Sequence, residues 1–177
     1  HSSSILLAIK WIAPNDNYEN IPEFISNQCA EWESSNENDL FAKQLCNKVK
    51  KEKLPILIGD RFPDFVLPMS TGKQENIKSL LGKKLTIVDM WASWCGPCRK
   101  ENKNVLVPIW DEYNTSGLQI IGYALDSDEK LWKKAIDKDG AGRWLHASHL
   151  LGDESPLFES IRISTIPSNF ILNDEGI

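Results

Sequence analysis

Two cysteines separated by two residues, Cys95 and Cys98, carry the clearest reactive chemistry of this 177-residue sequence. They lie in the stretch VDMWASWCGPCRKE, behind one aspartate and two tryptophans. The run Leu85 to Met90 before them is rich in β-forming residues, and a helical pattern follows them. We therefore expect Cys95 at the start of a helix, where unpaired backbone N–H groups and the helix dipole stabilise a thiolate.

This position predicts a redox-active dithiol. A cysteine at a helix start, with a second thiol one turn away, can have its pKa lowered from about 8.5 into the range of about 3.5 to 7.5. The thiolate is the attacking species in thiol–disulfide exchange, so Cys95 is the predicted nucleophile. Cys98 lies three residues later on the same face and can resolve the mixed disulfide. Pro97 falls in the first helical turn, where its missing N–H removes no hydrogen bond.

Two other roles for the cysteine pair fit the sequence less well. A structural zinc site needs four ligands, and the nearest histidines, His146 and His149, lack the usual zinc spacing. We therefore predict no metal. A disulfide that spans only two residues is strained and readily reduced, which suits redox traffic better than a structural staple.

The elements around the dithiol alternate between strand and helix. Proline and glycine punctuate short apolar runs from residue 54 onwards, and residues 70–73 (STGK) predict a hairpin tip. Further expected elements are a helix at 99–113 bent at Pro108, a strand at 118–124, a helix at 129–138, a short helix near 155–160 and a strand at 168–172. This order predicts an α/β protein with βαβ units around a central sheet.

Residues 1–54 have a different, helical character. One helical stripe contains Ile21, Ile25, Cys29 and Trp32, and a second, begun by the polar residues 36–39, contains Phe41, Ala42, Leu45, Cys46 and Val49. Cys29 and Cys46 both fall on apolar faces, as small core residues or as a disulfide joining the two helices. Neither has a context that stabilises a thiolate. We interpret this region as a packing or partner-docking extension, not a second catalytic centre.

Composition excludes several classes of protein. Hydrophobic residues at 41% and charged residues at 25% are typical of a globular protein with a real core. The net charge of -5 argues against nucleic-acid binding, which needs a basic surface. No apolar run approaches the roughly 20 residues that span a bilayer. The start HSSSILLAIKWIA lacks the features of a signal peptide, so any signal segment or membrane tether is expected upstream of this sequence.

The motif Trp94-Cys95-Gly96-Pro97-Cys98 resembles the thioredoxin active site. The wider pattern is similar to the TlpA/ResA-like envelope branch of the thioredoxin-like thiol–disulfide oxidoreductases, a branch related to AhpC/TSA proteins. The matching segments are the leader GDRFPDF at 59–65, GKK at 82–84, IPSNFIL at 166–172 and DEG at 174–176. The resemblance implies a thioredoxin-like domain at residues 55–177, with residues 1–54 as an N-terminal helical extension. The family's closing strand and helix would follow Ile177 and are missing from this sequence.

The resemblance also assigns roles near the dithiol. It implies a cis peptide bond between Ile166 and Pro167, which would lie beside the cysteines and leave backbone groups free to bind an extended substrate. Trp94, with Gly96 and Pro97 between the cysteines, would form the substrate-contacting surface, although core packing is an alternative for Trp94. The sequence favours packing roles for Trp91, Trp110, Trp132 and Trp144, and solvated positions on the helix for Arg99 and Lys100.

Two acids are candidates for handling the second proton. Asp89, six residues before Cys95, matches the buried acid of thioredoxins; burial would raise its pKa and let it accept the proton of Cys98. Glu101, three residues after Cys98, matches an acid near the dithiol in the ResA-like branch, with a solvent-facing helix residue as the alternative. We favour Asp89 for this role.

The predicted function is a thiol–disulfide oxidoreductase that reduces protein disulfides in the periplasm or cell envelope of a bacterium. Its redox-active group is the Cys95–Cys98 disulfide, no cofactor is needed, and a membrane-linked or thioredoxin-type donor would restore the dithiol. A thiol peroxidase of the related group is the alternative enzyme, but residues 88–94 lack the proline and threonine of a peroxidatic loop. A non-enzymatic scaffold with a vestigial dithiol is disfavoured by the presence of Asp89, the C-G-P-C motif and Pro167.

Overall fold

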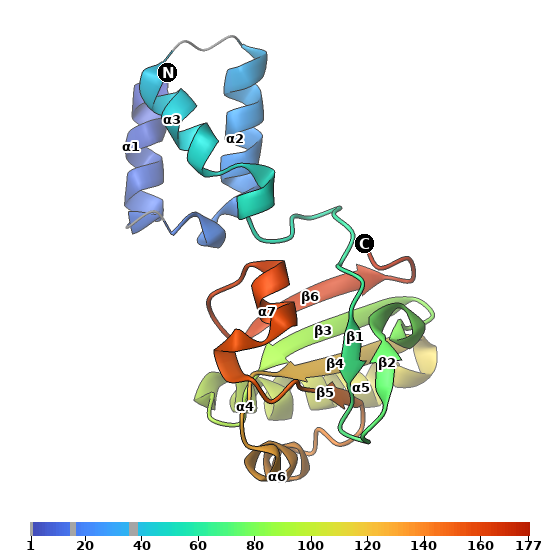
Figure 1. The fold of residues 1–177 in the computed structure, drawn as a ribbon. Helices are drawn as coiled ribbons and strands as arrows, with labels where there is room; N and C mark the ends of the chain where they lie inside the picture. Colours follow the sequence, from blue (N-terminus) through green and yellow to red (C-terminus); the bar gives the residue numbers. More distant parts are fainter. Residues whose placement is uncertain (1, 15–16, 36–38) are drawn as a thin grey trace. The chain divides into compact units, whose positions relative to one another are not determined.

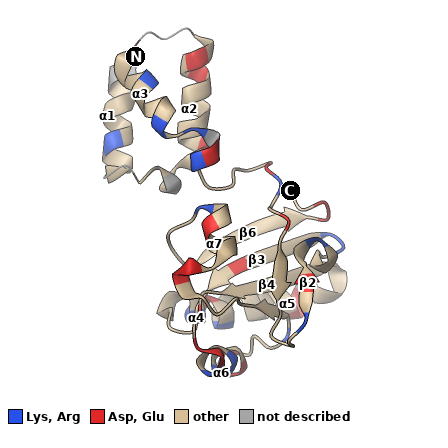
Figure 2. Ribbon diagram, in the orientation of Figure 1, with Lys and Arg blue, Asp and Glu red and all other residues tan. Residues whose placement is uncertain are grey.

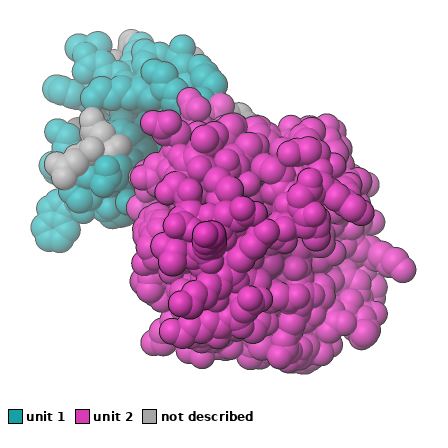
Figure 3. Space-filling model, turned by 60° about the horizontal axis from the view of Figure 1, so that its bottom comes forward, with its two compact units in different colours: residues 1–60 teal, residues 61–177 magenta. Residues whose placement is uncertain are grey.

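The computed structural model describes residues 2–14, 17–35 and 39–177. They divide into two compact units, residues 1–60 and residues 61–177, which are described separately below (Figure 3). The division falls after Asp60, whereas the sequence placed it after Leu54. Leu54 explains the difference, because its side chain is 3% exposed and belongs to the hydrophobic core of the helical unit.

The described residues of the first unit form three α-helices, α1 (Ser2–Ile12), α2 (Pro22–Ser34) and α3 (Leu40–Lys48), together with short 3-10 turns (Figure 1). Asp39 caps α3, because its carboxylate accepts hydrogen bonds from the N–H groups of Phe41 and Ala42. The proposed start signals at 36–38 lie outside the described residues. The prediction that Phe41 lies on the apolar stripe of α3 is wrong. Its side chain is 69% exposed, because it lies about 100° around the helix from the buried Ala42.

A disulfide between Cys29 and Cys46 joins α2 to α3, with a Cα–Cα distance of 5.6 Å. Of the two roles considered for these cysteines, the structure shows the disulfide. The bond lies next to the core of the unit, which is made of Ile9, Ile25, Cys29, Trp32, Ala42, Leu45, Val49 and Leu54. Because so small a unit buries little apolar surface, a covalent link between two of its helices contributes substantially to its stability.

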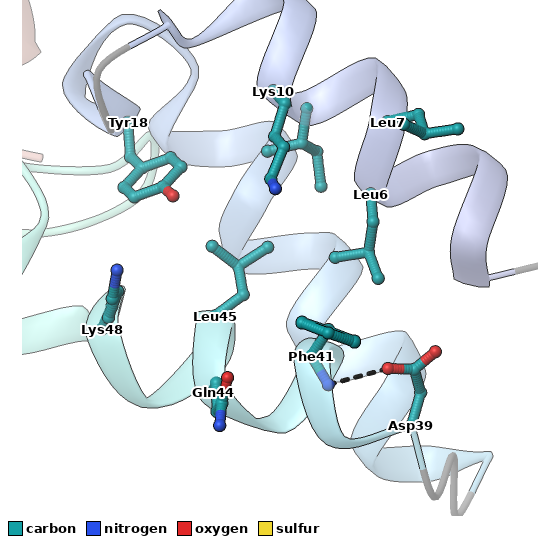
Figure 4. Close-up of a pocket in the computed structure, with 10 residues that line it drawn as sticks. Leu6, Leu7, Lys10, Tyr18, Asp39, Phe41, Gln44, Leu45 and Lys48 are labelled. Atoms are coloured by element: carbon teal, nitrogen blue, oxygen red, sulfur yellow. Dashed lines mark hydrogen bonds between the residues drawn. The ribbon is translucent and has the colours of Figure 1, made fainter.

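A cavity of about 440 Å³ opens between α1 and α3 (Figure 4). Its walls are mainly apolar, with Leu6 and Leu7 from α1 and Phe41 and Leu45 from α3. None of the residues that the sequence assigns to the dithiol site lines this cavity. The cavity is therefore a feature of the helical unit alone.

The second unit is built on a four-stranded mixed sheet of order β5-β4-β3-β6. β3 (Leu85–Trp91), β4 (Leu118–Ala124) and β5 (Leu145–Ala147) are parallel, and β6 (Ser168–Asn173) pairs antiparallel with β3. Helices cover both faces, with α5 (Val107–Tyr113) on one face and α7 (Pro156–Ile161) on the other (Figure 1). The three predicted strands are confirmed, whereas β5 was expected to be part of a loop.

The two central strands, β3 and β4, are buried on both faces, whereas the edge strand β6 is partly exposed. Every residue of β3 after Leu85 is buried, and so is most of β4. A hairpin of β1 (Val66–Pro68) and β2 (Gln74–Asn76) precedes the sheet and turns where the sequence predicted. α6 (Glu129–Asp139), which connects β4 to β5, confirms the predicted tryptophan-containing helix.

The segment after the dithiol differs from the single bent helix that was expected. It consists of α4 (Gly96–Glu101), a π-helical turn (Asn102–Leu106) and α5. In that turn the N–H of Val107 donates to the carbonyl of Asn102, five residues earlier. Pro108 follows at once and has no N–H to donate, so the wider turn lies where the regular hydrogen-bond ladder must be interrupted.

Candidate active site

The dithiol lies where β3 passes through a short loop into α4. Cys95 is the N-cap of α4, and its Sγ accepts a hydrogen bond from the N–H of Cys98, with a distance of 3.2 Å from that nitrogen. The two cysteines form a disulfide with a Cα–Cα distance of 5.3 Å, so the structure shows the oxidised state. The N–H that contacts Cys95 Sγ is positioned to stabilise a thiolate there after reduction. This geometry matches the helix-start position that the sequence predicted.

The two tryptophans of the motif have opposite surroundings. Trp94 is 64% exposed, so the alternative of core packing is wrong for this residue. Trp91 is fully buried, as expected for a supporting side chain. Gly96 and Pro97 are also exposed beside the disulfide, which gives the site an open, partly apolar surface.

The Ile166–Pro167 peptide bond is cis, as the resemblance implied. Register places these residues close to the dithiol loop. Met90 pairs with Ser168, so Pro167 lies at the end of the sheet where the chain leaves β3 toward Cys95. Ile166 is half-buried and Pro167 is exposed. Both residues are therefore available to a substrate that approaches the same end of the sheet.

Asp89 is buried in the middle of β3 and is the one acidic residue of this strand (Figure 2). Burial, followed by the negative charge of Glu101, raises its pKa from 3.8 to about 7. The direction and the main cause agree with the sequence prediction. An acid with a pKa close to neutrality can both accept and release a proton under physiological conditions.

Glu101 is half-buried and has a specific partner that the sequence reasoning missed. Its Oε1 accepts a hydrogen bond of 2.8 Å from the side-chain amide of Asn169. Asn169 pairs directly with Asp89 in the β3–β6 register. A register prediction from the position of Pro167, two residues before Asn169, could have found this contact.

Arg99 is held in place, and the prediction of a solvated helix residue is wrong. Its guanidinium donates through Nε and Nη2 to the carboxylate of Asp139, with 2.7 Å between Nη2 and Oδ1. Its Nη1 donates to the carbonyl of Ser93 at 3.0 Å. The bond to Asp139 raises the pKa of Arg99, so its charge is secure. Asp139 follows Arg99 by 40 positions, a separation that no local pattern reveals.

A buried aromatic cluster surrounds Trp91, the residue at the end of β3. The ring of His146 contacts Trp91 and Trp144, with centroid distances of 5.8 and 5.7 Å. Its Nε2–H donates to the carbonyl of Ala141 at 2.8 Å, and burial lowers its pKa to about 4, so the imidazole is neutral. Gly122 leaves room for this ring: a Cβ there would lie 2.8 Å from His146 Nδ1.

Within the described ranges, we find no cluster of three or more His, Cys, Asp or Glu side chains that could hold a metal ion. The same residues contain no helix with the length and apolar character needed to cross a membrane.

Solved structures of thiol–disulfide oxidoreductases have a fold similar to that of this chain. A thiol–disulfide oxidoreductase from Bacteroides fragilis matches with a TM-score of 0.61 and 28% identity, covering 67% of this chain and 86% of that chain. The thioredoxin domain of a Bacteroides vulgatus thiol–disulfide oxidoreductase matches with a TM-score of 0.60 and 27% identity, covering 67% and 82%. The fold and the dithiol define a thioredoxin-like thiol–disulfide oxidoreductase.

Sequence relatives assign the family. Residues 58–177 match the AhpC/TSA family, and the chain belongs to it. The thiol–disulfide oxidoreductase ResA of Bacillus cereus is 38% identical over 131 residues, which cover 71% of this chain and 68% of that protein. The thioredoxin-like protein YneN of Bacillus subtilis is 26% identical over 127 residues, or 72% of each chain. The resemblance to the ResA-like branch is thereby confirmed.

Proposed function

We propose that this oxidoreductase reduces disulfides of other proteins through Cys95 and Cys98. The thiolate of Cys95 attacks one sulfur of the substrate disulfide, and the other substrate sulfur leaves as a thiolate that takes up a proton. Cys98 then loses its proton to Asp89 and attacks Cys95 Sγ in the mixed disulfide. This attack releases the second substrate sulfur, so the substrate leaves with both sulfurs reduced. The two electrons have passed from the dithiol to the substrate, and Cys95 and Cys98 are left as a disulfide.

One observation supports the resolving step of this reaction in particular. Asp89, whose pKa is raised to about 7, lies buried on the strand that leads into the dithiol, and Glu101 on the dithiol helix contributes to that rise. A thiol that must lose a proton during the resolving step needs a nearby base of about this pKa. The exposed Trp94 and Pro167 would supply the surface against which the substrate chain lies.

We place the protein in the bacterial envelope, with a membrane-linked or thioredoxin-type donor that returns two electrons to the disulfide. The support is the similarity to ResA of Bacillus cereus. The Cys29–Cys46 disulfide agrees with an oxidising compartment, where structural disulfides persist.

Insulin reduction by the wild-type chain and by Cys95→Ser tests the proposal. The wild type should precipitate the insulin B chain in the presence of a reductant, and Cys95→Ser should not. Equilibration with glutathione buffers should give a reduction potential near about -250 mV, whereas a value near about -120 mV would indicate an oxidant. Equal insulin reduction by the wild type and Cys95→Ser would contradict the proposal.

A further inference from the structure

The peptide unit of Ser93, two residues before Cys95, is held from both sides by charged side chains. Its N–H donates to Asp126 Oδ2 at 2.9 Å, and its hydroxyl donates to Oδ1 of the same carboxylate. Its carbonyl accepts from Arg99 Nη1 at 3.0 Å. Every polar group of Ser93 therefore has a charged partner, and hydrogen bonds to charged groups are the stronger kind.

These partners are themselves fixed by burial. Asp126 is 2% exposed and lies two residues after the end of β4. The side chain of Asp139, at the end of α6, has no exposed surface and pairs with Arg99 and also with Lys103, whose Nζ lies 3.1 Å from Oδ1. Two carboxylates and two cations thus form a balanced set. We call Asp126, Ser93, Arg99 and Asp139 the Ser93 clamp.

The clamp acts on the loop that carries the substrate-facing residues. Immediately around Ser93, the carbonyl of Trp91 accepts from the N–H of Leu125 at 2.9 Å, and the carbonyl of Ala92 accepts from the N–H of Cys95 at 3.1 Å. Trp94 projects to solvent between these fixed points. None of the contacts uses a sulfur atom, so the clamp does not depend on the Cys95–Cys98 bond.

We propose that Asp126 and Arg99 are positioning residues, which hold Ser93 so that Trp94 and Cys95 keep the geometry for attack after the disulfide has opened. The inference rests on the proposed function and names residues that act on the same site through Ser93. Arg99 contributes the planar fork that reaches Asp139 and the Ser93 carbonyl at once. A lysine supplies the same charge without that fork.

Asp126→Asn and Arg99→Lys in the full 177-residue chain test this role, with Asp111→Asn as the control. Asp111 forms an exposed ion pair with Arg143 in the same unit, and Arg143 is not a member of the clamp. The readout is the second-order rate constant of the reduced protein with insulin and with oxidised glutathione, measured from pH 6 up to its alkaline plateau. Circular dichroism and urea unfolding show that each variant is folded.

Both clamp variants should react about tenfold more slowly than wild type, because misplacement of a reacting group reduces the rate steeply. The loss should persist on the alkaline plateau, where a changed thiolate pKa has no effect, and Asp111→Asn should match wild type. Ser93→Ala, which keeps its backbone contacts, should lose about threefold and covers the case that Asp126→Asn does not fold. Two results would overturn the inference. One is a folded Asp126→Asn variant that reacts at the wild-type rate, and the other is an Arg99→Lys variant that does so. Failure of the wild type on insulin alone would instead refute the proposed function, since oxidised glutathione still reports on the clamp.

Discussion

Asp89 and Asn169 lie opposite each other on β3 and β6, and the amide of Asn169 donates its hydrogen bond to Glu101. Asn169 on the edge strand β6 therefore neighbours both Asp89 and Glu101, the two acids that the sequence proposed for the second proton. Asp89 is the buried member with a pKa near neutrality, and Glu101 is the half-buried member that helps to raise it. This arrangement favours Asp89 as the proton acceptor and Glu101 as a group that adjusts it.

Kinetics of the two acid variants separate these roles. Asp89→Asn should slow the resolving attack of Cys98 by about a hundredfold, because general-base assistance contributes about that factor or more. Glu101→Gln should change this step far less. The measurement is the decay of a mixed disulfide formed with a fluorescent peptide, followed by rapid quenching. A large defect in Glu101→Gln alongside normal decay in Asp89→Asn would assign the base to Glu101.

The raised pKa of Asp89 predicts a pH-dependent stability. Below about pH 4 the carboxyl is protonated in both states, and between about pH 4 and pH 7 the folded state retains a proton that the unfolded state has lost. Asp89 therefore destabilises the folded protein increasingly over this window, by on the order of 4 kcal/mol in total. His146, with its lowered pKa, acts in the opposite sense between about pH 4 and 6.5.

The difference between Asp89→Asn and wild type isolates this effect, because His146 is common to both. In oxidised protein, the variant should gain stability relative to wild type as pH rises from about 4 to about 7, as measured by urea unfolding. In Glu101→Gln the window should end at a lower pH, because one cause of the raised pKa is removed. A pH-independent difference would show that Asp89 is ionised throughout.

The two tryptophans of the motif should respond differently to truncation. Trp94→Ala should raise KM for a protein substrate severalfold and change the free energy of unfolding by less than about 0.5 kcal/mol, because the side chain is exposed. Trp91→Ala should lower the free energy of unfolding by about 3 to 5 kcal/mol, because this indole is fully buried. Thermal unfolding and steady-state kinetics on both variants check the contrast, and a large stability loss in Trp94→Ala would argue against a contact surface.

The disulfide of the helical unit should matter for stability and not for catalysis. The double variant Cys29→Ala/Cys46→Ala should lower the free energy of unfolding of this unit by about 3 kcal/mol, since the bond closes a loop across 17 positions. Urea unfolding followed at 222 nm, a signal to which the helices of both units contribute, should show a transition that the double variant moves to lower urea concentration. The rate of insulin reduction should be unchanged. A variant that loses both stability and insulin reduction would contradict the prediction that this disulfide does not serve catalysis.

Local patterns were sufficient for the longer strands of the second unit because their apolar runs are long. β3 and β4 each span seven residues, and their β-branched side chains predicted them correctly. β5 has only three residues, LHA, which carry no strand pattern; its pairing with β4 defines it. Short strands are set by their neighbours, so the sequence alone cannot reveal them.

The same distinction applies to the site. Cys95 and Cys98 were proposed from their spacing at a predicted helix start, and Asp89 from its match to the buried acid of thioredoxins, because all three lie close together in the chain. The partners of Glu101 and Arg99 were missed, because Asn169 and Asp139 are 68 and 40 positions away. Residues that act on the dithiol loop from a distance become visible only when the sheet brings β4, β6 and α6 together.

The position of Gly122 beside His146 limits which amino acids can replace it. His146 cannot retreat from an added Cβ, because Trp91 and Trp144 hold its ring and Ala141 binds its Nε2. Any other amino acid at this position would place a Cβ 2.8 Å from His146 Nδ1 and 3.1 Å from Trp91 Nε1. In a library that covers all single substitutions and is selected for activity, position 122 should therefore retain glycine alone.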